Sequence, residues 1–285
     1  MPPSRARHTG TILDRIVTDR RVRLQEDRAT RDEDALRALL VQQPAPLDFV
    51  ARLRDGRRAT PEGARLRLVA EIKRASPSKG LFDADLDAVV QARAYAEAGA
   101  AAISILTEPD HFRGSIQDLA DVSAAFAGDP DRPALLRKDF IFDPYQVLEA
   151  RAFGADALLL IVMMLEPYAL RDLLAATHAL GMEALVEVHD ADELDAAVAA
   201  GARVIGVNNR DLRTFEEDLG TFERLAALAP AGVTLVAESA IRSPEDARRM
   251  AYAGAHALLV GEALVRSGTV IDTARSFMLT GAAAK

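Results

Sequence analysis

Two opposite charges lie two residues apart in an apolar run of this sequence. Glu71 and Lys73 flank Ile72, and the run ends at the Ser-Pro-Ser-Lys-Gly segment of residues 76–80. On a β-strand, residues two apart point to the same face, so a carboxylate and an ammonium would share the inner face of this strand. Burying such a pair is costly unless it is compensated or used. We therefore predict that this stretch forms one wall of an active site.

Lysine is rare in this chain and its positions are informative. Of the 35 basic residues only four are lysines, namely Lys73, Lys79, Lys138 and Lys285. Arginine is thus the default surface cation, whereas lysine supplies a compact ammonium that can titrate. Lys73 and Lys138 both end apolar, strand-like runs. Chance placement is the alternative, but the two positions favour a chemical role.

The elements that must hold these residues follow a regular alternation after residue 67. Apolar, β-rich runs occur at 68–72, 101–106, 134–137, 156–162, 183–188, 203–207, 232–237 and 256–260. Helical patterns follow them near 85–98, 116–126, 144–153, 166–180, 190–200, 219–228, 243–253 and 269–279. Near-continuous apolar strands suit a sheet buried on both faces. Eight such units favour a closed (β/α)8 barrel over an open doubly wound sheet.

The predicted fold is therefore α/β: one (β/α)8 (TIM) barrel domain over residues 1–285, with its eight βα units in 68–279. Residues 1–67 lack the alternation and read as a helical extension over the barrel, with helices near 11–28 and 31–42. Residues 49–56 are taken as a connection to the first strand. Glycines at 99, 154, 201 and 254 each follow a helical pattern, where glycine suits the left-handed helix end.

Composition excludes several classes of function. The net charge of −8 argues against a nucleic-acid or anionic-membrane surface. The absence of cysteine excludes disulfides, thiolate nucleophiles and cysteine–metal sites. No apolar run approaches the ~20 residues of a membrane span, and no signal segment follows the first residues. We expect a cytoplasmic protein, monomeric or weakly dimeric, whose partner is a small molecule.

The active site of such a barrel lies at the carboxyl ends of its strands. Six of the predicted strands end in a segment that carries polar residues: Glu71, Lys73 and Ser76; Arg137, Lys138, Asp139 and Phe140; Glu187 and His189; Asn208, Asn209 and Arg210; Glu238, Ser239 and Ala240; Gly261, Glu262 and Ala263. Solvated strand ends and helix caps are the plain alternative, and Asp139, Asp190 and Ser243 suit capping. Glutamates within or directly after apolar runs, together with two lysines, instead favour a catalytic cluster.

The last two strands suggest a phosphate site. Ser239, Ala240 and Gly261 are small, so backbone N–H groups there could approach an anion near the next helix. Barrels of this kind often bind phosphate after their seventh and eighth strands. Taken alone the signal is weak, because a glycine after a strand is often only a turn.

These residues carry a resemblance to one family. Glu-x-Lys-Arg-x-Ser-Pro-Ser-Lys-Gly at 71–80 resembles the signature of the indole-3-glycerol phosphate synthase family. Similar matches run in order through Ser104–Glu108, Phe112–Ser115, Leu136–Ile141, Leu159–Val162, Gly181–Val188, Ile205–Leu212, Val236–Ser239 and Leu259–Glu262. The resemblance covers about residues 65–265, and the family also carries N-terminal structure over the barrel mouth.

The resemblance implies a carboxy-lyase of tryptophan biosynthesis. Its reaction closes 1-(2-carboxyphenylamino)-1-deoxyribulose 5-phosphate to indole-3-glycerol phosphate with loss of CO2 and water, without metal or organic cofactor. Lys138 matches the general acid, Glu187 the acid/base of dehydration, and Lys73 a second lysine on the substrate. Glu71 and Glu238 would keep the lysines charged and oriented, and Asn208 would form a hydrogen bond with the reacting part of the substrate. The implied binding residues are Ser76 and Arg210 for polar contacts, Phe140 for the aromatic ring, and Ser239, Ala240, Gly261 and Glu262 for phosphate.

Two residues depart from the family pattern. Ala240 stands where glycine is common, and alanine does not easily adopt a positive φ. Glu262 stands where some relatives have Ser or Thr, so its carboxylate is expected to point away from phosphate and to leave only its N–H for binding.

Two rival interpretations remain open. One is phosphoribosylanthranilate isomerase, another phosphate-sugar barrel. A resemblance to that family would imply a Cys/Asp acid–base pair on the same fold, and this chain has no cysteine. The other is a catalytically silent barrel that serves as an interaction subunit. Lost lysines or glutamates would favour the silent barrel, and none is missing from the pattern.

Overall fold

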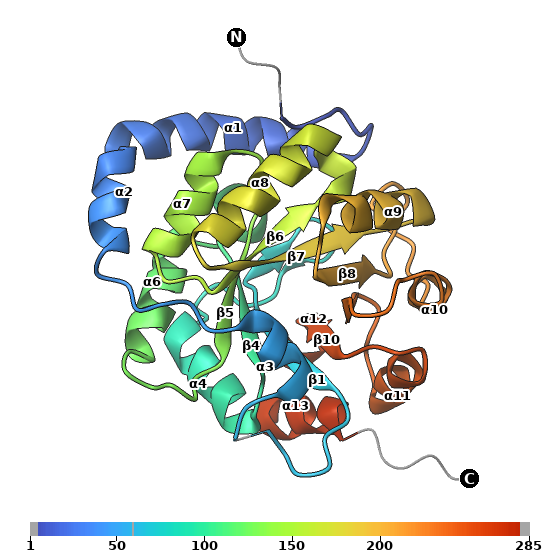
Figure 1. Cartoon of the computed structure of the whole chain (residues 1–285). Coiled ribbons are helices and arrows are strands. Elements are labelled where there is room, and N and C mark those ends of the chain that lie inside the picture. Colours follow the sequence, from blue (N-terminus) through green and yellow to red (C-terminus); the bar gives the residue numbers. More distant parts are fainter. Residues whose placement is uncertain (1–4, 59, 280–285) are drawn as a thin grey trace.

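Eight parallel strands close into a barrel in the computed structural model, which describes residues 5–58 and 60–279 (Figure 1). Around the barrel the strand order is β1-β10-β9-β8-β7-β6-β5-β4, so β1 closes the ring by pairing with both β10 and β4. The predicted (β/α)8 barrel is confirmed. The strands are β1 (Arg67–Ile72), β4 (Ala102–Leu106), β5 (Ala134–Lys138), β6 (Ala157–Ile161), β7 (Glu183–Val188), β8 (Val204–Asn208), β9 (Thr234–Glu238) and β10 (Ala257–Val260). Residues 1–4 of the predicted extension, Lys285 and the other residues after 279 lie outside the described part.

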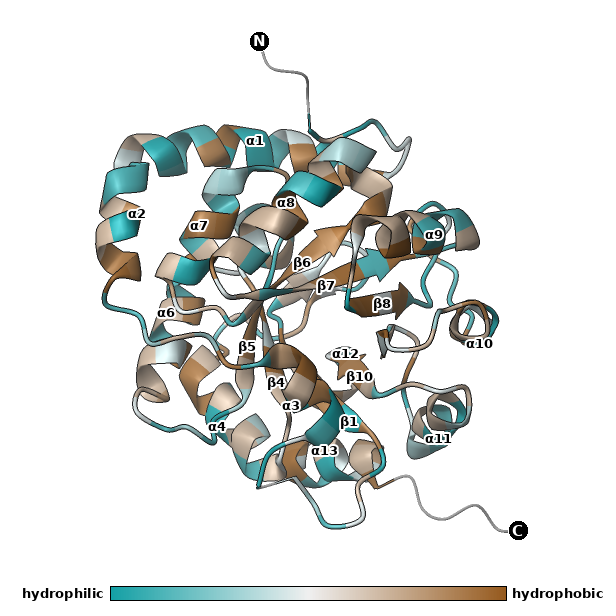
Figure 2. Cartoon of the chain, in the orientation of Figure 1, coloured by the Kyte–Doolittle hydropathy of each residue, from teal (hydrophilic) through white to brown (hydrophobic). Residues whose placement is uncertain are grey.

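The strands are apolar along almost their whole length because both of their faces are covered. β4, β6 and β8 are buried at every residue. Figure 2 shows hydrophobic strands at the centre and hydrophilic patches on the surrounding helices. Burial on both faces favours β-branched and aliphatic residues over a strict alternation of polar and apolar ones. A charged residue inside such a strand therefore needs a specific reason to be there.

The helices that cover the barrel begin and end within about three residues of the predicted positions. They are α4 (Ala88–Ala98), α6 (Ile116–Ala125), α7 (Pro144–Ala152), α8 (Pro167–Ala179), α9 (Ala191–Ala200), α10 (Gly220–Ala226), α11 (Pro244–Tyr252) and α13 (Val270–Met278). Gly99 and Gly201 end α4 and α9 with φ of 96° and 89°, which confirms the predicted left-handed helix ends.

Three helices precede the first strand: α1 (Ile12–Thr30), α2 (Glu33–Leu40) and α3 (Phe49–Asp55). The side chain of Thr11 accepts a hydrogen bond from the Leu13 N–H and begins α1. α3 was not expected, because its segment was taken as a connection. Asp48 caps this helix through the Ala51 N–H, and Phe49 and Leu53 are buried under it.

Short elements follow several strands and were also not expected. They are the hairpin of β2 (Ala75–Ser76) and β3 (Gly80–Leu81), the helices α5 (Pro109–Phe112) and α12 (Glu262–Val265), and the 3-10 turn η1 (Val162–Met164). All lie in loops at the carboxyl ends of strands, where a barrel builds its site. No helix within residues 5–58 and 60–279 is long and apolar enough to cross a membrane.

Candidate active site

The carboxyl ends of the strands surround a cavity of about 390 Å³. Every residue proposed for the site from the sequence lines it: Lys138, Glu187, Lys73, Glu71, Asn208, Glu238, Ser76, Phe140, Arg210, Ser239, Ala240, Gly261 and Glu262. They come from the ends of six different strands and the loops that follow them. The fold thus gathers into one pocket residues that are up to 191 positions apart in the chain.

Glu71 is the centre of the charged cluster in this pocket. Its Oε1 lies 2.6 Å from Lys73 Nζ and its Oε2 lies 3.0 Å from Lys138 Nζ. Burial alone would raise the pKa of Glu71, but the charges of Lys138 and Lys73 lower it to about 2. One buried carboxylate therefore holds both lysines at the end of the barrel.

Lys138 is a cation at neutral pH. Burial lowers the pKa of its ammonium, but the carboxylates of Glu71, Glu238 and Glu187 outweigh burial and raise it. Its side chain is 21 % exposed and lines the cavity, so a ligand can reach it. The group is charged and accessible, as a proton donor must be.

Glu187 and Glu238 lie on neighbouring parts of the same wall, and their acidities diverge. Burial raises the pKa of Glu187, but His189, Lys138 and Asn208 together lower it below its usual value. Asn208 Nδ2 donates to Glu187 Oε1 at 3.2 Å. For Glu238, burial and the charge of Glu187 raise the pKa well above its usual value. Two carboxyl groups with pKa values pushed apart are the arrangement that acid–base chemistry requires.

Glu238 contributes to the raised pKa of Lys138 as a nearby charge, but among the described residues it forms no ion pair with either lysine. Glu71 makes both lysine ion pairs there, and Glu238 Oε1 has no hydrogen-bond partner. Lys138 contributes to the pKa of Glu238 only as a nearby charge. Glu238 is therefore better suited to act as a neutral, protonated group.

Two glycines make room for these carboxylates. A Cβ on Gly206 would lie 1.9 Å from Glu238 Oε1, and a Cβ on Gly261 would lie 2.4 Å from Glu71 Oε1. Real Cβ atoms do not approach so closely, so any larger residue would displace a carboxylate. Gly261 thus has a structural reason to be glycine besides the close anion approach expected from the sequence.

Arg210 is held at the rim of the cavity by its neighbours. Its Nε lies 3.1 Å from Glu217 Oε1, and its Nη1 donates to Ser78 Oγ at 2.8 Å. Arg242 forms an ion pair with the other oxygen of Glu217. These contacts join the loops after β1, β8 and β9, and they leave other guanidinium N–H groups of Arg210 for a ligand.

Aromatic and aliphatic side chains form the opposite part of the cavity. The rings of Phe112 and Phe140 lie with centroids 5.8 Å apart at an interplanar angle of 38°. Ile12 and Ile16 of α1 also line the cavity, so the N-terminal extension contributes directly to the pocket. A flat aromatic ligand suits such a wall.

The ends of β9 and β10 form the third part of the cavity. Ser239 and Ala240 follow each other with φ of 62° and 61°. Ala240 therefore adopts the positive φ that alanine disfavours, and the strained turn is retained at the pocket wall. Glu262 forms an ion pair with Arg266 at 3.2 Å, although Glu262 still lines the cavity. The Phe82 ring is near two cations, with its centroid 5.5 Å from Lys73 Nζ and 5.4 Å from the Arg266 guanidinium carbon.

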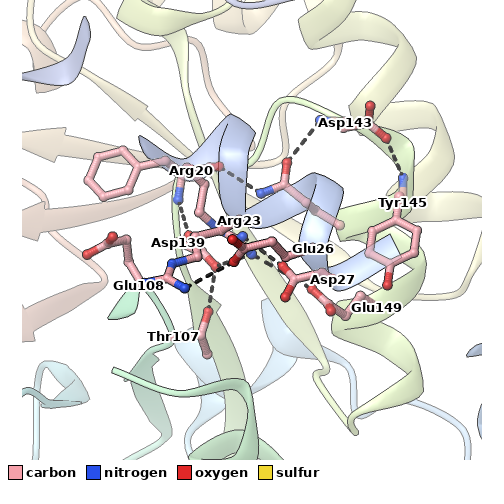
Figure 3. Close-up of polar contacts among 12 residues, drawn as sticks. Arg20, Arg23, Glu26, Asp27, Thr107, Glu108, Asp139, Asp143, Tyr145 and Glu149 are labelled. Atoms are coloured by element: carbon pink, nitrogen blue, oxygen red, sulfur yellow. Dashed lines mark hydrogen bonds and ion pairs between the residues drawn. The ribbon is translucent and has the colours of Figure 1, made fainter. Parts of the chain in front are cut away.

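The prediction that Asp139 caps a helix is wrong. Asp143 caps α7, whereas Asp139 lies in a buried ion network (Figure 3). Its carboxylate accepts from Arg20 Nε at 3.2 Å, from Arg137 Nη2 at 3.0 Å and from Thr107 Oγ1 at 2.8 Å. The reason is that successive side chains of β5 point to opposite faces of the strand. Lys138 faces the cavity, so Arg137 lies behind the strand, against α7. The other two capping predictions, Asp190 and Ser243, are confirmed.

Several residues of the cavity were not identified from the sequence. Ile12, Ile16 and Phe112 had an apolar pattern, but nothing in that pattern says that they face a ligand. Glu217 and Arg242 lie in loops of irregular structure, for which the sequence carries no periodic signal. His189 was noted after its strand without a role, and it lies behind Glu187 at 3.3 Å.

Fold and site together define a (β/α)8-barrel enzyme with an acid–base cluster at the carboxyl ends of its strands. The family model described as indole-3-glycerol phosphate synthase matches residues 13–277. The chain belongs to the indole-3-glycerol phosphate synthase family. It is thus a carbon–carbon lyase, a decarboxylating enzyme of tryptophan biosynthesis.

Individual relatives agree with this family. An indole-3-glycerol phosphate synthase of Roseiflexus sp. (strain RS-1) is 48% identical over 269 residues, which cover 93% of this chain and 97% of that protein. One from Dehalococcoides mccartyi (strain CBDB1) is 45% identical over 268 residues, covering 94% and 100%. Among solved structures, 3-hexulose-6-phosphate synthase from Salmonella typhimurium is similar with a TM-score of 0.62 and 13% identity, covering 75% of this chain and 98% of that one. At that identity the likeness concerns the fold alone.

Proposed function

We propose that this chain closes 1-(2-carboxyphenylamino)-1-deoxyribulose 5-phosphate to indole-3-glycerol phosphate by a fixed division of labour among the cavity residues. The observation that carries the proposal is Glu71, one carboxylate that binds Lys73 at 2.6 Å and Lys138 at 3.0 Å inside the pocket. Ring closure needs a proton donor near the ribulose carbonyl and positive charge near the substrate's anionic groups. Positioning and electrostatics would supply most of the rate.

Lys138 is the general acid of the closure step in this proposal. Its ammonium donates a proton to the ribulose carbonyl oxygen as the aromatic carbon attacks the carbonyl carbon. The raised pKa keeps this proton in place until the oxygen becomes basic enough to take it. Lys73 contacts the substrate from β1, with Phe82 and Glu71 fixing its ammonium.

Glu187 is the acid/base of the dehydration. Its lowered pKa makes it a carboxylate in the resting enzyme, so it first accepts a proton and then returns one to the departing hydroxyl. Asn208 holds this carboxylate through its 3.2 Å hydrogen bond and can also bond the substrate. Glu238, whose pKa is raised, would stand opposite as a neutral hydrogen-bond donor.

The remaining residues bind the parts of the substrate that do not react. Phe140 packs on the aromatic ring beside Phe112, and Ser76 and Arg210 meet the carboxylate that leaves as CO2. The backbone at Ser239, Ala240, Gly261 and Glu262 would bind the phosphate. The Glu262–Arg266 pair supports the assignment, because it neutralises a carboxylate that would otherwise repel phosphate.

The chain would work as one domain, with the segment of residues 1–67 over the barrel of residues 68–279. Ile12 and Ile16 support this because they line the same cavity as the strand-end residues. A cytoplasmic location, and a monomer or weak homodimer that needs no metal or organic cofactor, complete the proposal. The reactants are polar small molecules, and the net charge of −8 offers no general attraction for nucleic acid.

The direct experiment adds the carboxyphenylamino-deoxyribulose phosphate to micromolar wild-type protein and follows indole fluorescence together with CO2 release. We expect both signals to rise in equal molar amounts. A chelator added to the same assay should leave the rate unchanged. Absence of product would sink the proposed reaction, and CO2 release without indole would sink the assignment of ring closure.

A further inference from the structure

His189 lies behind the catalytic wall, between two carboxylates. It follows β7 directly, and its side chain is 6 % exposed. Its Nε2 is 3.3 Å from Glu187 Oε1, and its Nδ1 is 3.0 Å from Glu193 Oε2 on α9. Glu193 is itself fixed, since its Oε2 also accepts from the His189 backbone N–H at 2.9 Å. The imidazole is therefore a buried bridge from α9 to the acid/base of the proposed reaction.

The geometry around the ring selects one protonation state. A carboxylate can only accept hydrogen bonds, so Nδ1 must carry a proton to bond Glu193. A neutral ring would then present the lone pair of Nε2 to the Glu187 carboxylate, which is repulsive. A ring protonated on both nitrogens is attracted to both neighbours. Nε2 makes no hydrogen bond with good geometry, so its contact with Glu187 is mainly one of charge.

We propose that His189 is a positioning residue that remains an imidazolium and thereby keeps Glu187 ionised, so that Glu187 enters the reaction as a base. The proposal rests on the proposed role of Glu187 in dehydration. In that step the Glu187 carboxylate accepts the proton released as the ring becomes aromatic. It then gives a proton to the departing hydroxyl, which leaves as water. Glu187 ends as it began, and His189 keeps its proton throughout.

The surrounding charges explain why a second cation is needed there. The groups that bear on His189 and Glu187 are Glu193 of α9, Lys138 of β5, Glu238 of β9 and, as a neutral donor, Asn208 of β8. Lys138 is already paired with Glu71 at 3.0 Å. Burial lowers the pKa of His189, but Glu187 and Glu193 outweigh it and raise the pKa to about 10. Without the imidazolium, burial and Glu238 would favour a protonated Glu187.

The test is the dependence of kcat on pH for His189→Asn. We expect the acidic limb of the profile to move to higher pH by at least about one unit, because Glu187 loses its nearest positive charge. At pH 6 kcat should fall about tenfold or more, activity should recover toward pH 9, and KM should change little. An equal loss of kcat at every pH would indicate a structural role alone and would overturn the proposal.

His178→Gln is the matched control. His178 lies in the last turn of α8, where its Nε2 is 2.9 Å from Oε1 of Glu183, the first residue of β7, and neither residue lines the cavity. Removing this second His–Glu pair should leave the pH profile of kcat at its wild-type position. A shift of the same size in both variants would contradict a specific role for His189.

A second measurement does not depend on folding of the His189→Asn variant. Nitrogen-15 NMR of histidine-labelled wild-type protein should show one imidazolium ring at pH 8 that titrates only above pH 9. Glu193→Gln should move that resonance and thereby assign it. A His189 ring that is neutral at pH 7.5 would overturn the proposal. This titration needs no substrate, so it remains decisive even if the wild-type protein forms no indole product.

Discussion

Lys138 and Asp139 are neighbours in the chain, yet their side chains enter two polar clusters of opposite character. The first cluster faces the cavity and contains Glu71, Lys138, Glu187 and Glu238. The second lies behind β5, where Arg20 of α1 binds Asp139 (Figure 3). Arg137 binds the same carboxylate. Both clusters are buried and both carry charge, so burial alone does not distinguish a catalytic site from a structural one.

The difference lies in how completely each cluster is satisfied. At the cavity, Ser76 Oγ and Glu238 Oε1 have no hydrogen-bond partner, and Glu71 Oε2 and, behind the wall, His189 Nε2 have only the ion-pair contacts to Lys138 at 3.0 Å and Glu187 at 3.3 Å. In the network behind β5, Arg137 uses Nε, Nη1 and Nη2 for Thr107, Gln146, Asp139 and Glu149 at distances of 2.8–3.1 Å. No side-chain atom of that network is among the buried unpartnered atoms of the described residues.

The unpartnered polar atoms indicate where a ligand should bind. Buried polar groups normally find partners, so a set of atoms without partners around one cavity indicates groups reserved for a substrate. A fully paired network instead fixes architecture: Arg20 ties α1 to the loop after β5, and Asp139 holds the Phe140 N–H at 2.8 Å. Alternation along one strand assigns Lys138 to chemistry and Arg137 to structure.

The largest expected difference concerns a Glu→Gln change in each cluster. Glu187→Gln should lower kcat by roughly 10²–10⁴-fold, because an amide cannot accept and return a proton. Glu149→Gln, in the network behind β5, should lower the unfolding midpoint and leave kcat of the folded protein within a few-fold of wild type. Initial rates of indole fluorescence and thermal unfolding measure the two effects. Unchanged turnover for Glu187→Gln would remove it from the mechanism.

The next prediction concerns the network behind β5, where a substitution should lower stability strongly and kcat only slightly. Arg137→Met leaves Asp139 and Glu149 buried with one cation fewer, and breaking a buried ion pair typically costs about 3–5 kcal/mol. We expect the free energy of unfolding in urea to fall by about that amount, with kcat of the folded fraction changed far less than in Glu187→Gln.

Arg23→Met is the control for this prediction. It removes the solvent-accessible ion pairs that Arg23 of α1 makes with Asp110 and Glu26, and such pairs contribute little to stability. Its unfolding curve should overlay that of the wild type. Equal stability of Arg137→Met and Arg23→Met would show that the network behind β5 does not hold the fold.

The smallest predicted effect concerns the strained turn at the cavity wall. Ala240→Gly should raise the free energy of unfolding by about 1 kcal/mol, because glycine adopts φ near 61° without strain. Its backbone N–H is kept, so KM should not rise. Ala251→Gly in α11 should have the opposite sign and cost up to about 1 kcal/mol. Destabilisation by both changes would contradict strain at Ala240.

Much of the fold could be predicted because its signals are periodic. The apolar strand runs and the four glycines at helix ends gave the barrel and the helix positions, and the glycines have φ between 89° and 97°. α3 was missed because its short run, Phe49 to Asp55, is too brief to display a helical period. The hairpin of β2 and β3 was missed because each strand has only two residues.

The residues of the candidate site could be predicted where they lie in or directly after an apolar strand run. Glu71, Lys138 and Glu187 were found because a charge in an apolar strand is unusual. Asp139 was misread because its partner Arg20 lies 119 residues away, and no local pattern reports that contact. Glu217 and Arg242 were missed for the same reason, since loops of irregular structure bring them together.

The central claim is that the cavity cluster performs the chemistry with Lys138 as its proton donor. The most direct measurement is kcat of Lys138→Ala at saturating substrate, on protein shown by circular dichroism to be folded at the assay temperature. Lys73 still pairs with Glu71 in this variant, so folding should be retained. The account predicts a loss of roughly 10²–10⁴-fold in kcat. Turnover near the wild-type value would contradict it.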